Sequence, residues 1–543
     1  MRGVGMRRST IIVGCSVALT ATLTSCSAPA ATDATDTGKA SKSGYLTASD
    51  TSFEGTGPLT VQLDYDSVEA GGLDPQTAAT ARSWSIESLV YEPLVTVDPR
   101  FGIEPLLASS WKQPDATTYV FTLRKGVTFS NGRALTTADV VGSLQRLLKS
   151  KAAYAAQLGP VKSVTATGAD QVTVELTKAY TPFLAALANT PAAILPMKEI
   201  GDGSLDPAKE MLGTGPFVVK NHKQDQYWNF TRNTAYRDTK KVHVDDLKIE
   251  IVPQEAARLA ALRNGSAALV NFNNIDSMDQ LTGTRNAKVV SQANSDFYYL
   301  IQNSRNPDSP LADQKVRFAL NSALNRTEIA SVALGGQAVP TGVTPSVLPG
   351  ACAPAKLPAA TTAPPKTSAT AALKKAGTLR LTVYTSEPAV GQIAQVIQQQ
   401  LAKAGVTVKI QKYDDTTYGA KVFGAKPDFD LAIGWFAGYV DASMVSRWWN
   451  PVLAGFSGTF LNDDKTLDAL IDKAAGEPDG TARTKTLAEL CARVDTAAQM
   501  LPLVTRPSVI GYRTDQVSPT LRAAEGYGNF LRDITQYTLP AEK

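Results

Sequence analysis

Two alternations of hydrophobic and polar residues run through the chain, one with the period of a strand and one with the period of a helix. Residues 379–384 alternate with period two and predict a strand. Within 390–404 the apolar residues recur at helical spacing, at Val390, Ile393, Ile397 and Leu401. Gly405 ends this helix, and 406–410 alternates again. Strand, helix and strand over about thirty residues predict a parallel pair joined by a right-handed crossover, typical of an α/β fold.

The next apolar run, 429–434, predicts a further buried strand. Trp435 to Tyr439 follow at its carboxyl end. Because ligands of open α/β sheets bind outside the carboxyl ends of the strands, this aromatic turn is a candidate binding segment.

The N-terminal half shows the same kind of pattern. Regular alternation begins at 59–63, and 119–123 predicts another strand. Asn131-Gly132 indicates a turn, and Thr136 with Asp139 forms a capping box that opens a helix over 139–148.

The first 25 residues indicate an export signal. Three arginines precede the apolar stretch 11–23, which is shorter than the roughly twenty residues that cross a bilayer. Residues 23–26, Leu-Thr-Ser-Cys, resemble a lipoprotein signal-peptidase site, so we expect Cys26 to carry the lipid that anchors the protein to the outer face of the cytoplasmic membrane. The alternative is a plain secretory signal cut nearby, and Arg7-Arg8 leaves Sec or Tat export open.

Two stretches lack large apolar residues. Residues 26–56 are rich in Ala, Thr, Ser, Asp and Gly and predict a flexible stalk. The Ala/Pro/Thr-rich stretch 349–370 predicts a surface excursion within one folded region.

Composition and charge narrow the class of protein. The chain has 543 residues, 43% of them hydrophobic, and 54 basic against 50 acidic side chains. Removal of the signal takes three arginines and leaves 51 against 50, so no basic surface for nucleic acid is expected. This length corresponds to roughly three to four domain-sized units.

Motifs spread along the chain resemble the peptide/nickel family of extracellular solute-binding proteins, family 5. They are Tyr-Glu-Pro-Leu at 91–94, Leu-Ala-Ser-Ser-Trp at 107–111, 121–132, Leu-Thr-Thr-Ala-Asp-Val-Val at 135–141, Gly-Thr-Gly-Pro-Phe at 213–217, 258–265, 316–326, Leu-Gly-Gly at 334–336 and Leu-Pro-Leu-Val at 501–504. They follow the family order and cover nearly all of the mature chain.

The resemblance implies a two-lobed, type II periplasmic-binding-protein-like fold, with an extra subdomain in lobe I and a chain that crosses twice between the lobes. Lobe I would comprise 57–302, with the subdomain at about 87–205, and the returning segment 505–543; lobe II would comprise 303–504. Such a monomer would close on a small or peptide solute and deliver it to the permease subunits of an ABC importer.

The resemblance also implies where the ligand binds. The family turn that matches 434–439 faces the cleft, so Trp435, Phe436 and Tyr439 are candidates. Peptide-binding members have, at the position of Gly438, an Asp that pairs with the peptide ammonium. Gly438 removes that partner, which disfavours ordinary peptide recognition. Asp441 could replace it, or it could cap the helix that follows.

On the lobe I side, the family loop that leads into the helix ending near Tyr91 lines the cleft, and the candidates there are Thr80, Ser83 and Trp84. Each aromatic candidate could instead belong to the core. An aromatic side chain from each lobe would suit a cyclic, planar or cationic solute.

Other chemistry has little support in the sequence. His222 and His243 are the only histidines and neither has ligands at metal spacing, so we expect neither a metal site nor a cofactor. No nucleophile elbow, metalloprotease motif or phosphate loop stands out, so we do not expect an enzyme. The alternatives to an importer component are a lipid-anchored extracellular hydrolase and a non-transport solute sensor or chaperone. Cys352 and Cys491 form either one disulfide or two buried thiols.

Overall fold

The computed structural model describes residues 44–541 except 51, 68–72, 78–80, 151, 362–365, 437, 451–453, 455 and 457–459. The expected signal, the Cys26 anchor and the candidate Thr80 lie outside the described residues.

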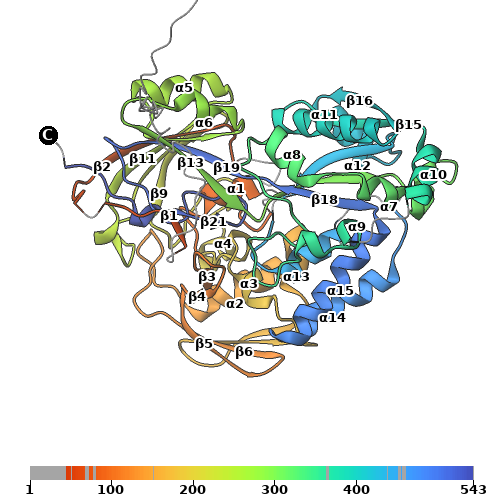
Figure 1. The fold of residues 1–543 in the computed structure, drawn as a ribbon. Helices are drawn as coiled ribbons and strands as arrows, with labels where there is room; N and C mark the ends of the chain where they lie inside the picture. The colour runs from red at the N-terminus through yellow and green to blue at the C-terminus, as the bar shows by residue number, and fades with distance from the viewer. Residues whose placement is uncertain are drawn as a thin grey trace, which may run out of the picture. The chain divides into compact units, whose positions relative to one another are not determined.

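An eight-stranded sheet forms the first of two large sheets, in the order β21-β13-β19-β12-β2-β11-β10-β9. The strands are β2 (Gly57–Leu63), β9 (Phe217–Lys223), β10 (Tyr227–Arg232), β11 (Val244–Ile251), β12 (Leu269–Phe272), β13 (Ala287–Asn294), β19 (Ser508–Arg513) and β21 (Ala524–Glu525). The predicted strand 59–63 lies in β2, which pairs in parallel with both β11 and β12. Helices α5 (Glu255–Asn264) and α6 (Asp276–Leu281) pack on β12, β19 and β13 (Figure 1).

A four-stranded antiparallel sheet follows β2 in the chain, within the range expected for the inserted subdomain. Its order is β5-β6-β8-β7. The strands are β5 (Ala108–Asp115), β6 (Thr118–Leu123), β7 (Val161–Ala166) and β8 (Gln171–Leu176), beside the hairpin of β3 (Val95–Val97) and β4 (Ile103–Pro105). The helices are α1 (Ala81–Glu87), α2 (Thr137–Lys149), α3 (Phe183–Leu187) and α4 (Met197–Gly201). The predicted capping box is confirmed, since the Thr136 amide donates to Asp139 Oδ2 over 3.0 Å.

The second large sheet has five strands in the order β16-β15-β17-β14-β18. The strands are β14 (Phe297–Gln302), β15 (Thr378–Tyr384), β16 (Thr407–Tyr413), β17 (Leu431–Phe436) and β18 (Met500–Thr505). The predicted crossover is confirmed, because β15 and β16 pair in parallel and α11 (Pro388–Lys403) joins them. Helices α11 and α12 (Asp415–Phe423) pack against β15 and β16 (Figure 1). The other helices are α7 (Gln314–Ser322), α8 (Arg326–Ala333), α9 (Pro358–Thr361), α10 (Lys366–Ala376), α13 (Ala442–Ser446), α14 (Lys465–Gly476) and α15 (Thr481–Ala497).

We call the part built on the eight-stranded sheet, with its subdomain, lobe I, and the part built on the five-stranded sheet lobe II. The chain crosses between them at Ser295-Asp296, after β13, and at Arg506-Pro507, after β18. The expected first boundary, 302/303, needs correction, because β14 pairs with β17 and β18 of lobe II and every residue of it is buried. The two crossings are joined directly, since the Arg506 amide donates to the Asp296 carbonyl over 2.8 Å.

The predicted stalk is also too long at its C-terminal end. Tyr45–Thr47 form β1, which pairs antiparallel with β20 (Leu521–Arg522). The Thr47 hydroxyl donates to the Pro519 carbonyl over 2.6 Å. This pairing satisfies backbone N–H and C=O groups of residues 45–47. The composition of the segment alone does not predict it.

In the Pro/Thr-rich excursion, Cys352 is bonded to Cys491 of α15, and their Cα atoms are 6.4 Å apart. In the part of the chain that the structure describes, no helix combines the length and the apolar character needed to cross a bilayer.

Candidate ligand-binding site

A pocket lies where the two crossings meet, and both lobes line it. Lobe I supplies Asp64, Tyr65, Asn271, Phe272, Asn273, Ser508, Val509, Tyr527, Gly528 and Phe530, and lobe II with the crossings supplies Asp296, Tyr298, Glu387, Trp435, Arg506 and Pro507. The cavity volume is about 60 Å³, which holds only about four water molecules. A larger solute therefore requires the lobes to separate or the lining side chains to move.

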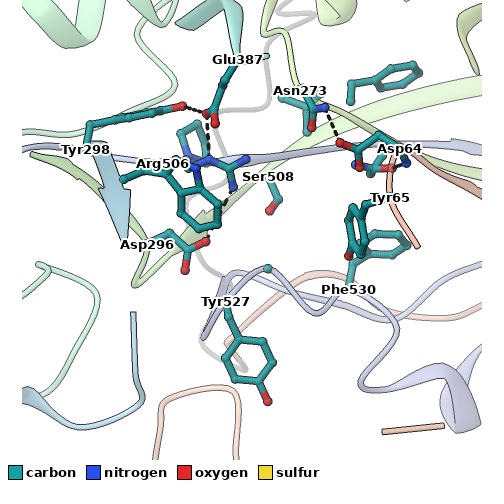
Figure 2. Close-up of a pocket in the computed structure, with 16 residues that line it drawn as sticks. Asp64, Tyr65, Asn273, Asp296, Tyr298, Glu387, Arg506, Ser508, Tyr527 and Phe530 are labelled. Atoms are coloured by element: carbon teal, nitrogen blue, oxygen red, sulfur yellow. Dashed lines mark hydrogen bonds and ion pairs between the residues drawn. The ribbon is translucent and has the colours of Figure 1, made fainter. Parts of the chain in front are cut away.

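Strand topology explains why polar side chains gather on the lobe I side. β2 and β12 are parallel neighbours, so the residues at their carboxyl ends meet at one edge of the sheet. Asn271 Nδ2 donates to Asp64 Oδ1 over 2.8 Å, and Asn273 Nδ2 donates to Asp64 Oδ2 over 2.5 Å (Figure 2). These bonds fix the carboxylate of Asp64 at the pocket wall.

An arginine network forms the opposite wall. Arg506 Nε donates to Glu387 Oε1 over 2.8 Å, and the Tyr298 hydroxyl donates to the same carboxylate (Figure 2). The guanidinium carbon of Arg506 lies 4.4 Å from the centre of a Trp435 ring. Although burial opposes ionisation, the charge of Glu387 holds the pKa of Arg506 well above its usual value.

Asp296 is a buried carboxyl group at the first crossing. The Gly438 amide donates to its Oδ1 over 3.0 Å, and its Oδ2 lies 3.7 Å from Arg506 Nη1. Burial raises the pKa of Asp296 to about 7, and Arg506 offsets this only in part. The reason is geometric, because the guanidinium is closer to Glu387 than to Asp296.

Comparisons with known proteins agree with this architecture. Residues 102–452 match the model of the bacterial extracellular solute-binding proteins, family 5 Middle. The chain belongs to this family. It is 26% identical over 471 residues to the nickel-binding periplasmic protein of Escherichia coli, covering 80% of this chain and 87% of that one. It is 30% identical over 268 residues to the oligopeptide-binding protein AppA of Bacillus subtilis, covering 47% and 48% of the two chains.

Solved structures show the fold. The crystal structure of the ABC transporter substrate-binding protein CtaP from Listeria monocytogenes superposes with a TM-score of 0.77 at 21% identity, covering 90% of this chain and all of that one. The two-lobed family 5 fold expected from the sequence is therefore confirmed.

Of the residues that the family resemblance nominates, Trp435 lines the pocket. It is the second-to-last residue of β17, and its ring faces the guanidinium of Arg506. Phe436 does not line the pocket. Its ring stacks on Trp448 with centroids 4.0 Å apart, so it packs within lobe II.

Gly438 lies against the first crossing and not against open pocket space. An added Cβ would come 1.9 Å from the Ser295 carbonyl oxygen, so no side chain fits at this position. Its contribution to the pocket is indirect, through the amide that donates to Asp296. In this chain the carboxyl group beside position 438 is that of Asp296, at the first crossing.

Tyr439 and Asp441 do not line the pocket. Tyr439 contacts Tyr154 of the subdomain edge to face, with centroids 6.1 Å apart, and so joins the two lobes. Asp441 caps α13 by accepting from the Ser443 amide over 2.7 Å, and it also pairs with Arg483 at 2.9 Å. The capping alternative raised by the sequence is the role that the structure shows.

On the lobe I side, Ser83 and Trp84 are buried. The Ser83 hydroxyl donates to the Ser67 carbonyl over 2.6 Å. Trp84 packs edge to face on Tyr527, with centroids 5.2 Å apart. Because Tyr527 lines the pocket, Trp84 supports the wall from behind.

Sequence reasoning missed the polar residues of both walls, namely Asp64, Asn271, Asn273, Asp296, Glu387 and Arg506. Ligands of open α/β sheets bind at the carboxyl ends of the strands, and this rule points to Trp435. It also points to Asp64, which directly follows the strand 59–63. Among the described residues, no group of three or more His, Cys, Asp or Glu side chains could hold a metal ion. The one acidic partner of a histidine there is Asp66, 3.1 Å from His222 Nε2.

Proposed function

We propose that this protein is the substrate-binding component of an ABC importer, which captures a small solute between its lobes and delivers it to a membrane permease. The observation that carries the proposal is the pocket lined by both lobes at the point where the chain crosses between them. Two crossing segments form a hinge, and closure about a hinge buries a ligand held by both sides. The family membership supports the same role.

The ligand is a small or peptide-like solute. The relatives are named for nickel and for oligopeptides, so the family name does not choose among ligand classes. At position 438 the close approach of the Ser295 carbonyl leaves no room for an acidic side chain, which supports a solute other than an ordinary peptide.

For its location, we propose that the exported protein is tethered by a diacylglycerol group on Cys26 to the outer face of the cytoplasmic membrane. The sequence of residues 23–26 and the periplasmic relative support this placement. A tether raises the effective concentration of a monomeric receptor near its permease. The Cys26→Ala variant should leave the membrane fraction, whereas its retention there would contradict the anchor.

Native mass spectrometry of the full-length protein purified from its own host tests the function. We expect a small solute bound at one copy per chain, which is released on unfolding and raises the melting temperature when it is added back. Chemical conversion of that solute by the purified protein would instead favour a hydrolase. A protein that carries no solute and gains no stability from host extract would contradict the proposed function.

A further inference from the structure

The charges of the pocket are unequal. Among the described residues that line it, the acids are Asp64, Asp296 and Glu387, and the base is Arg506. Their formal charges sum to minus two when all the groups are ionised, and to minus one when Asp296, whose pKa burial raises to about 7, holds its proton. The acids stand on both lobes, since Asp64 follows β2 whereas Glu387 precedes α11.

The charge behind the lobe I wall does not cancel this excess. Arg258 is buried behind Asp64 and donates to backbone carbonyls, including that of Asn271 over 2.9 Å. The acidic Glu255 lies 3.8 Å from its guanidinium, so the two charges offset each other. A cleft with low-dielectric walls focuses the potential that remains and concentrates solutes of the opposite charge.

The aromatic lining suits a cation as well. Tyr65 and Trp435 line the pocket, whereas the ring of Tyr527 points away from it and packs on Trp84 (Figure 2). The ring of Trp435 already has a guanidinium stacked on it, that of Arg506. Aromatic rings attract cations and not anions through their faces, and this attraction strengthens as water is excluded.

We propose that the solute is an organic cation, an ammonium or guanidinium compound of net positive charge, held between the carboxylates of Asp64 in lobe I and Glu387 in lobe II. This inference rests on the proposed function, because it names the ligand class of the same pocket. A bound cation lowers the repulsion between the acidic faces of the two lobes and so favours closure. An anion adds to that repulsion and favours the open state.

Three planar probes of nearly equal shape test the charge preference: benzamidinium, neutral benzamide and benzoate. Calorimetric titration of the full-length protein near neutral pH should rank them in that order, with benzamidinium at least roughly tenfold tighter than benzoate at low ionic strength. Benzoate binding as tightly as benzamidinium, or no measurable binding of benzamidinium, would overturn the proposal.

Two matched variants separate charge from folding. Asp64→Asn removes a pocket carboxylate, and Asp279→Asn makes the same net change at an exposed position of α6 in the same lobe. We expect Asp64→Asn to weaken benzamidinium roughly three- to tenfold and to leave benzamide within about twofold. Asp279→Asn should change neither. Equal weakening of all three probes by Asp64→Asn would show a merely structural role and would refute the inference.

The native solute distinguishes this inference from the proposed function. A net-positive solute in the host-purified protein supports both. An anionic solute leaves the importer role standing and contradicts the cation preference. A protein that holds no solute contradicts the importer role itself.

Discussion

The buried carboxyl group of Asp296 should make the stability of this protein depend on pH in a direction that most acidic residues do not produce. Its surroundings are the backbone amide of Gly438, the guanidinium of Arg506 and, beyond that, the carboxylate of Glu387. The Asp296→Asn substitution keeps the shape of the side chain and an acceptor for the Gly438 amide, and it removes the titration.

The magnitude follows from the difference between the pKa of about 7 in the folded protein and the usual value of 3.8. Between these values the unfolded chain has lost the proton that the folded chain keeps, so the free energy of unfolding falls as pH rises. Stability is fully present below pH 3.8 and is lost by the time the pH passes about 7. The total loss is about 4 kcal/mol, of which about 3 kcal/mol falls between pH 5 and pH 8.

Thermal unfolding at these two pH values measures the effect. For a chain of this size, about 3 kcal/mol corresponds to a melting-temperature change of about 3 °C. The melting temperature of Asp296→Asn, relative to wild type, should therefore rise by that amount from pH 5 to pH 8, while exposed Asp279→Asn shows no such trend. An offset between Asp296→Asn and wild type that is the same at both pH values would refute the reasoning.

Two further predictions concern packing and covalent structure. Gly438→Ala should lower the free energy of unfolding by about 1–3 kcal/mol because its Cβ would overlap the Ser295 carbonyl. Gly419→Ala, in the open space around α12, should be neutral or stabilising, and equal melting temperatures for the two variants would contradict this. Cys352 and Cys491 should resist alkylation in denaturing, non-reducing buffer, and reduction should cost about 2–5 kcal/mol of stability; alkylation of both thiols without reductant would disprove the bridge.

Local periodicity was enough to predict much of the fold. The strand and helix periods of 379–410 place β15, α11 and β16 correctly, because each pattern reports which face of one element is buried. The family motifs added the two-lobed arrangement. The sequence alone places the first crossing too late because β14 is apolar on both faces, and a uniformly apolar segment gives no period that shows which sheet it joins.

The candidate site was harder to predict, for a related reason. Asp64 and Asn271 are 207 residues apart in sequence, and Gly438 and Asp296 are 142 apart. The first contact depends on β2 and β12 being neighbours in the sheet, and the second on residue 438 lying against the first crossing. Neither arrangement leaves a pattern in the local sequence. Trp435 and Phe436 both follow the same apolar run, so the sequence predicts both as binding residues. Trp435 lines the pocket, whereas Phe436 packs on Trp448 within lobe II.

The most direct test of the account is a calorimetric titration of Trp435→Ala with the solute that native mass spectrometry identifies. Trp111→Ala, at a half-buried position of β5 in the subdomain, is the matched control. If the pocket between the lobes binds the solute, Trp435→Ala should weaken binding at least roughly tenfold and Trp111→Ala should bind like wild type. Unchanged affinity of Trp435→Ala would show that the solute binds elsewhere.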